Sequence, residues 1–190
     1  QVMADNKDQA RVFDLRYSPF NDNHSAPFHR NVGGYHPAKL SRYQDIISFG
    51  ITKAGSQLNG ETIMNNPVLD MLNCKYVLSK SERGEEVIMR STSYGNAWLV
   101  GELKFYSGAK EALNALQVED LRTVAVMEGQ AEVAKIAKDS SDFVKMVSYS
   151  SDSVRYKSST KGDGFAVFSE VYYAEKNGAW KVYVDGKPAK

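Results

Sequence analysis

The spacing of apolar residues predicts two helices in the first half of the chain. After Pro37, the residues Leu40, Tyr43 and Ile47 recur at helical spacing, so they should face a core on one side of a helix. Pro37 suits the first position of that helix, where its missing N–H costs nothing. The Asn-Pro pair at 66–67 predicts a second helix start, because Asn is a good N-cap and Pro fits the first helical turn.

Apolar runs before and after these helices predict short strands. They cover residues 11–15, 76–78, 87–89, 97–106 and 123–127. The charged turn between the second and third of these runs indicates a hairpin. Helical composition follows at residues 109–116 and again, over a short stretch, at residues 132–138.

The last third of the chain has a different pattern. Four strand-like runs cover residues 143–149, 153–159, 165–173 and 180–185, separated by short polar segments, two of them Gly-containing, and this is typical of a sandwich or a curved sheet. The pair Asp185-Gly186 is a strong hairpin-turn signal. We therefore expect an α+β fold, with a mixed α/β region over 1–140 and a mostly antiparallel, sandwich-like β region over 141–190, packed together as one compact unit.

Composition narrows the classes of partner. The 190 residues include 24 basic and 23 acidic side chains, a net charge of +1, so no nucleic acid is expected as a partner. No run of about 18 apolar residues is present, so this stretch should not span a membrane. The single cysteine, Cys74, cannot form an internal disulfide. The opening residues Q-V-M-A-D are not typical of a signal peptide, and we expect them to be a fragment boundary.

Candidate metal and catalytic residues are few. The spacing of His24 and His29 occurs among zinc ligands, but no second pair follows at a suitable distance and the only thiol is Cys74. We therefore expect these histidines to form hydrogen bonds within a loop, with no metal and no cofactor. The chain has no G-x-S-x-G motif and no marked pair of carboxylates, so we expect no catalytic residue in it.

One candidate ligand-binding site precedes the first predicted helix. Backbone N–H groups at Gly33 and Gly34 could face an anion, because a Gly-Gly turn before a helix start can expose them. Lys39 and Arg42 are three residues apart and should share an exposed helix face. With Tyr35 and His36, these residues would suit a lipid-linked phosphate. The other interpretation is an ordinary turn followed by a solvated basic face.

A second candidate site lies among the aromatic residues near the end of the chain. Sugars stack on aromatic rings, and Tyr172 and Tyr183 could contact a glycan there. We expect Phe168 and Trp180 to lie in the core, the usual place for aromatic residues in strands. Glu170 could bind a sugar or serve as a paired charge at a sheet edge.

Several stretches of the sequence resemble the soluble part of YfhO-like bacterial membrane proteins. The similar motifs are G-G-Y-H-P-A-K-L-S-R-Y-Q-D-I-I at 33–47 and N-N-P-V-L-D-M-L-N-C-K-Y-V-L at 65–78, with further similarity at 11–15, 95–100 and 168–187. The family pattern has a tight turn where this chain has a longer loop before Trp180, and it continues with further strands where this chain ends.

The resemblance implies a location and a role. Members of that family are polytopic and similar to glycosyltransferases that use lipid-linked sugars. This chain would lie on the extracytoplasmic side of the bacterial cytoplasmic membrane, tethered to the membrane-embedded remainder of the same protein. It would be a non-catalytic domain that helps to recognise the acceptor or substrate, a glycan or a lipid-linked phosphate. The alternative is a membrane-tethered carbohydrate-binding module; an independent hydrolase lacks any supporting set of residues.

Overall fold

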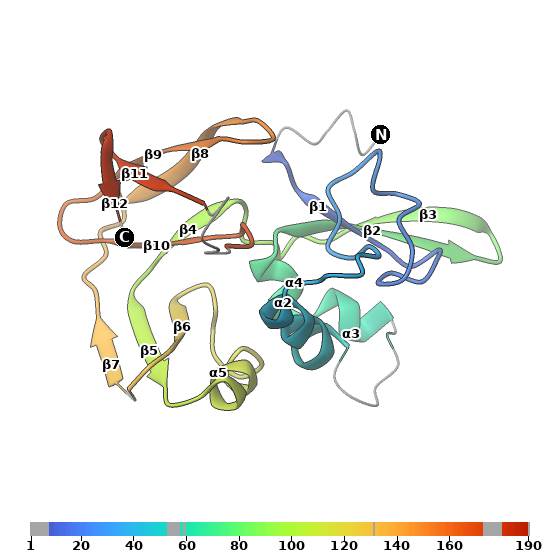
Figure 1. Ribbon diagram of the computed structural model, residues 1–190, viewed down its shortest axis with the longest axis horizontal. Coiled ribbons are helices and arrows are strands. Elements are labelled where there is room, and N and C mark those ends of the chain that lie inside the picture. Colours follow the sequence, from blue (N-terminus) through green and yellow to red (C-terminus); the bar gives the residue numbers. More distant parts are fainter. Residues whose placement is uncertain (1–7, 53–57, 59, 131, 173–179, 190) are drawn as a thin grey trace.

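A computed structural model describes residues 8–52, 58, 60–130, 132–172 and 180–189 (Figure 1). Short helices and several small sheets alternate along the chain, so the predicted α+β class is confirmed. Figure 1 shows helices α2, α3 and α4 on one side of the sheet β1–β2–β3, with α5 and the remaining strands beside them.

The first sheet combines a local hairpin with a strand from far away in the sequence. The hairpin of β2 (Cys74–Ser81) and β3 (Gly84–Met89) was predicted and is confirmed. The strand β1 (Arg11–Asp14) pairs with β2 in parallel, with Val12 opposite Tyr76. The main hydrophobic core lies between this sheet and the helices, where β1 and β2 contribute Phe13 and Val77.

The helix α4 (Pro67–Met71) begins where the sequence predicted. The side-chain oxygen of Asn66 accepts hydrogen bonds from the backbone N–H groups of Val68 and Leu69, at 2.9 and 3.2 Å. This is the N-cap arrangement that satisfies donors left free at a helix start. Upstream lies α3 (Gly60–Met64).

The predicted start of the first helix at Pro37 is wrong. The helix α2 begins four residues later and spans Ser41–Asp45, followed directly by a π-helical segment, η2 (Ile46–Ile51). Pro37 lies in a separate turn, in which the N–H of Ala38 donates to Nδ1 of His36 at 3.2 Å. A local side-chain bond therefore replaces the first helical turn. Ile47 is buried as expected, and Leu40 and Tyr43 are half-buried.

The π-helical segment joins two later parts of the chain. The carbonyl oxygen of Gly50 accepts a hydrogen bond from Asn66 Nδ2 and another from Gln117 Nε2, each at 3.0 Å. A Cβ at Gly50 would lie only 3.1 Å from a methyl group of Val68, so the close packing of η2 on α4 favours glycine there. The carbonyl thus ties η2 to α4 and to the residues that follow α5 (Ala109–Ala115).

The central strand of the second sheet is β5 (Glu102–Tyr106). It pairs in parallel with β6 (Val124–Glu128) and antiparallel with β7 (Glu132–Lys135). The helix predicted over 132–138 is therefore wrong. Pairing with β5, which places Ala134 opposite Leu103, overrides the helical composition of a segment too short to hold a helix by itself.

The last third of the chain is antiparallel, as predicted. The strands β8 (Phe143–Tyr149) and β9 (Val154–Ser159) pair with each other, and β10 (Phe165–Phe168) returns to pair with β4 (Ala97–Val100). The regions before and after residue 140 therefore share a sheet. The final hairpin joins β11 (Val182–Val184) to β12 (Lys187–Ala189).

The predicted turn at Asp185-Gly186 is confirmed. Both residues have positive φ angles, 50° and 76°, as a type I′ hairpin turn requires. The hairpin that it closes lies at the outside of the molecule, and every residue of β11 and β12 is exposed (Figure 1).

Candidate functional site

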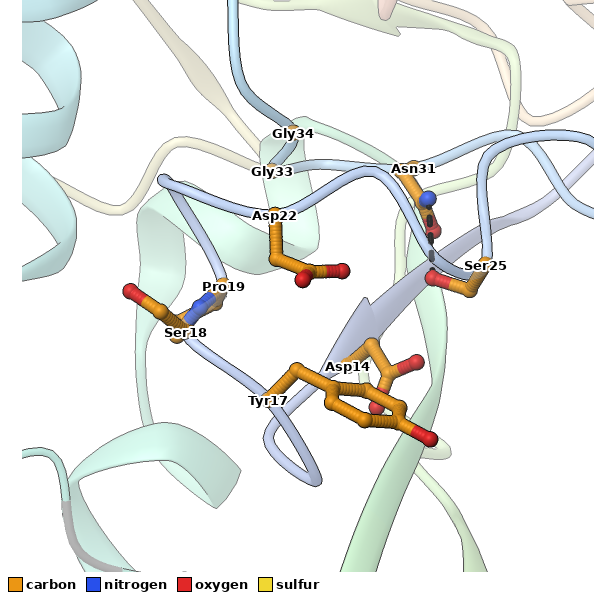
Figure 2. Close-up of a pocket in the computed structure, with 9 residues that line it drawn as sticks. All are labelled: Asp14, Tyr17, Ser18, Pro19, Asp22, Ser25, Asn31, Gly33 and Gly34. Atoms are coloured by element: carbon orange, nitrogen blue, oxygen red, sulfur yellow. Dashed lines mark hydrogen bonds between the residues drawn. The ribbon is translucent and has the colours of Figure 1, made fainter.

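The Gly33–Gly34 turn lies over a small cavity (Figure 2). The cavity has a volume of about 10 Å³, close to the minimum that holds one water molecule. A phosphate or a sugar is several times larger than a water molecule, so neither fits inside it. If this turn binds a ligand, it does so at its outer surface.

Backbone donors of the turn are already used within the chain. The N–H of Gly34 donates to the carbonyl oxygen of Pro19, and the N–H of Tyr35 donates to Oδ1 of Asn23, each at 2.8 Å. Gly33 is needed here for a steric reason, because a Cβ at this position would lie 1.8 Å from the same Pro19 oxygen. The turn is therefore held tightly, and two of its N–H groups are not available to an anion.

Two acidic side chains, Asp14 and Asp22, line the cavity. Figure 2 shows the carboxylate of Asp22 between the Gly33–Gly34 turn and Asp14. The Asp14 carboxylate accepts hydrogen bonds from Arg16 Nε at 3.0 Å and Arg16 Nη2 at 2.8 Å. Burial raises the pKa of Asp14, but the hydrogen bonds from Arg16 outweigh it and the net pKa is lowered. An ionised carboxylate at the cavity opposes the binding of an anion there.

The two basic residues proposed for this site contact different parts of the molecule. Lys39 Nζ donates to the carbonyl oxygen of Phe20 at 2.8 Å, so the expectation that Lys39 simply points into solvent is wrong. The Arg42 side chain is 85% exposed and pairs with Glu128 on β6 at 3.2 Å. Tyr35 and His36 are exposed. Among the described contacts, no single partner connects the six residues of this candidate site, which are Gly33, Gly34, Tyr35, His36, Lys39 and Arg42.

A larger concave surface lies on the C-terminal hairpin. This aromatic groove has a volume of about 510 Å³, within the range typical of small-molecule sites. It includes both tyrosines that the sequence singled out as glycan contacts, Tyr172 and Tyr183, whose exposed fractions are 62% and 58%. The residues that line it are Tyr172, Trp180, Lys181, Val182, Tyr183, Pro188 and Ala189.

The groove contains residues that the sequence analysis missed. Pro188 lies directly opposite Tyr183 in the hairpin, so the two present side chains to the same face. Lys181 precedes β11 and also lines the groove. The Asp185-Gly186 turn fixes this register, and counting outward from it could have placed Pro188 beside Tyr183.

The expected core positions of two aromatic residues need correction. Phe168 is 43% exposed at the end of β10, where its ring meets the edge of Tyr156 with centroids 4.7 Å apart. Trp180 is half-buried and lines the aromatic groove. Both residues lie at the margin of small sheets, where one side of a ring has no second layer to cover it.

Glu170 holds the segment that leads into the groove. Its carboxylate accepts hydrogen bonds from Arg30 Nη2, at 2.8 Å to each oxygen, and from Arg11 Nη2 at 3.2 Å. The preceding residue, Ser169, is buried and donates its N–H to the carbonyl oxygen of Asn96 at 3.0 Å. Glu170 is therefore a paired charge, one of the two roles expected for it, and Tyr172 follows it by two residues.

No protein-family model, curated protein or solved structure matches this chain. The site must therefore be judged on its geometry alone. Among the described residues, no helix is long and apolar enough to cross a membrane. In the same part of the chain, no three His, Cys, Asp or Glu side chains gather closely enough to share a metal ion.

The lone thiol lies far from solvent. Cys74 is fully buried at the start of β2, and burial raises the pKa of its thiol to about 11. A neutral thiol is a poor nucleophile. Cys74 is therefore a packing residue of the main core.

Proposed function

We propose that this chain is a non-catalytic glycan-recognition domain on the extracytoplasmic side of a YfhO-like polytopic membrane protein. Its role is to hold part of the acceptor or substrate near the membrane-embedded remainder of that protein. The single observation that supports this role is the aromatic groove, because it is a concave surface of ligand size and its exposed rings can stack on sugars.

The anchoring of the segment that precedes Tyr172 supports the proposal further. Glu170 ties the segment before Tyr172 to two arginines of the first sheet region. A ring that is already positioned loses little conformational freedom when a ligand stacks on it, and this favours affinity. Tyr183 lies in the β11–β12 hairpin, whose well-defined turn limits the conformational freedom of this residue.

The direct test is binding of the isolated chain to a glycan array, followed by titration of the best ligand. We expect Tyr183→Ala to weaken binding by about tenfold, since that corresponds to about 1.4 kcal/mol for one lost ring contact. The matched control is Tyr35→Ala, which removes a tyrosine of similar exposure (54%) outside the groove. Equal affinity of the wild type and Tyr183→Ala would contradict the proposal.

The same groove would serve a self-contained carbohydrate-binding module. The sequence on both sides of this chain in its gene separates the two possibilities. Multiple flanking apolar segments, together with loss of glycan transfer in membranes carrying Tyr183→Ala, would favour the domain of a transferase. Glycan binding by the chain with no effect of Tyr183→Ala on transfer would favour the module.

A further inference from the structure

The charge of the aromatic groove indicates which sugars it takes. Among the described residues that line it, Lys181 is the one with a formal charge, and none carries a carboxylate. No ion pair of Lys181 is found among the described residues, so its ammonium group is available to a ligand. A ligand with a negative group could form a charge-assisted hydrogen bond there, which is about twice as strong as a neutral one.

The hydrogen-bonding groups of the lining agree with this charge. Lysine and tryptophan side chains only donate hydrogen bonds, and the tyrosine hydroxyl both donates and accepts. Lys181 and Trp180 therefore bias the groove toward donors, and none of the described residues that line it has an acceptor-only side chain to balance them. A neutral sugar presents hydroxyl groups that need acceptors as well as donors, whereas a carboxylate or phosphate group only accepts.

The geometry of the hairpin places this charge next to the stacking surface. Lys181 directly precedes β11, two residues before Tyr183, and both side chains line the groove. Tyr183 faces the same side as its partner Pro188. A sugar ring stacked on Tyr183 and Pro188 would therefore have Lys181 at its edge, where exocyclic groups project.

We propose that the aromatic groove binds an anionic sugar, with its carboxylate or phosphate group on Lys181 and its ring on Tyr183. This inference rests on the proposed glycan-recognition function and adds the class of sugar. Tyr172 also lines the groove and offers a second exposed ring to the sugar.

The experiment compares three ligands of one backbone: a β-1,4-linked mannohexaose, the corresponding hexamannuronate, and mannohexaose with a terminal 6-phosphate. We expect the wild-type chain to bind at least one charged ligand about three- to fivefold more tightly than the neutral one, the upper range for an exposed ion pair. The charged ligand that binds more tightly shows whether the groove prefers a carboxylate or a phosphate group. Raising the salt concentration from 50 to 300 mM should weaken only the charged ligand, because salt screens exposed charges.

Variants separate this inference from the proposed function. Lys181→Met should abolish the preference, so that the charged and neutral ligands bind with equal affinity. The control is Lys187→Met, which removes a lysine of the same hairpin that does not line the groove. Tyr183→Ala should weaken all three ligands. Equal wild-type binding of neutral and charged ligands, or an equal effect of the two lysine variants, overturns the anionic-sugar inference alone. Absence of binding to any glycan overturns the proposed function with it.

Discussion

Arg30 donates through one nitrogen, Nη2, to both carboxylate oxygens of Glu170, at 2.8 Å each, across 140 residues of sequence. Arg11 adds a third bond to the same carboxylate, and the exposed side-chain fractions are only 7% for Arg11 and 19% for Arg30 and Glu170. The guanidinium of Arg30 also lies 4.6 Å from the ring centre of Tyr149 on β8. This cluster joins the beginning of the chain to its last third.

Removing the charge of Glu170 should therefore destabilise the protein. Glu170→Gln leaves two largely buried arginines without their counter-ion, and we expect a loss of about 2–3 kcal/mol in the free energy of unfolding, below the full value for a completely buried pair. Urea denaturation measures this. The control Glu132→Gln changes an exposed residue of β7 and should alter stability by less than about 0.5 kcal/mol. An equally small effect of Glu170→Gln would show that the cluster adds nothing to stability.

Lys39 and Arg42 should differ when each is replaced by alanine. Lys39→Ala removes a hydrogen bond to the Phe20 carbonyl and should cost about 1 kcal/mol. Arg42→Ala removes an exposed ion pair with Glu128 and should cost less than about 0.5 kcal/mol. Thermal or urea unfolding of the two single variants gives the comparison. Equal effects would contradict the separate roles that these residues have in the fold.

Trp180→Ala should affect binding more than folding. Because Trp180 is half-buried in an open groove, we expect the free energy of unfolding to fall by about 1 kcal/mol, well short of the 3–5 kcal/mol typical of a fully buried tryptophan. Glycan affinity should fall at the same time. Trp98→Ala is the comparison, since that residue is 6% exposed and should show the larger value. A loss above 3 kcal/mol for Trp180→Ala would place the ring in a core.

Asp139 should remain ionised to a lower pH than an ordinary aspartate. The hydrogen bond from Lys161 Nζ, at 2.8 Å, together with bonds from Ser141, lowers the pKa of Asp139 to about 2 from its ordinary value of 3.8. Because the folded-state pKa is the lower one, the stabilisation by this carboxylate is complete above pH 3.8. It is lost as the pH falls through about 2. Carboxyl ¹³C NMR titration measures the value directly.

Lys161→Met is the matched test of this cause. The pKa of Asp139 should then rise toward 3.8 and stay below it, since the Ser141 bonds remain. Lys157→Met, on β9, is the control and should leave the pKa of Asp139 near 2. An unchanged value in Lys161→Met would exclude the lysine as the cause.

Features set by neighbouring residues could be predicted from the sequence. The N-cap at Asn66 and the turn at Asp185-Gly186 depend on side chains and backbone angles within a few residues, and both were correct. The predicted helix start near Pro37 was wrong for a different local reason, since the side chain of His36 offers the backbone a competing hydrogen bond. The prediction of a helix at β7 was wrong because the pairing partner, β5, lies about 30 residues away and composition does not reveal it.

The candidate sites were predictable to a similar extent. Aromatic composition pointed to Tyr172 and Tyr183 as possible glycan contacts, and both rings are exposed, but only the hairpin register places Pro188 beside Tyr183. The sequence left two roles open for Glu170 and could not choose between them, because its partners Arg11 and Arg30 lie at the other end of the sequence. Long-range pairs of this kind leave no periodic signal.

The distribution of near and distant pairings also sets the order in which the chain can fold during synthesis. The hairpins β2–β3 and β8–β9 join neighbouring segments, so each can form soon after it leaves the ribosome. By contrast, β1 must wait for β2, and the two arginines near the start stay without their counter-ion until Glu170 has emerged. We therefore expect nascent chains that end before residue 170 to remain protease-sensitive over residues 8–30, and to become protected there once the last third has been made.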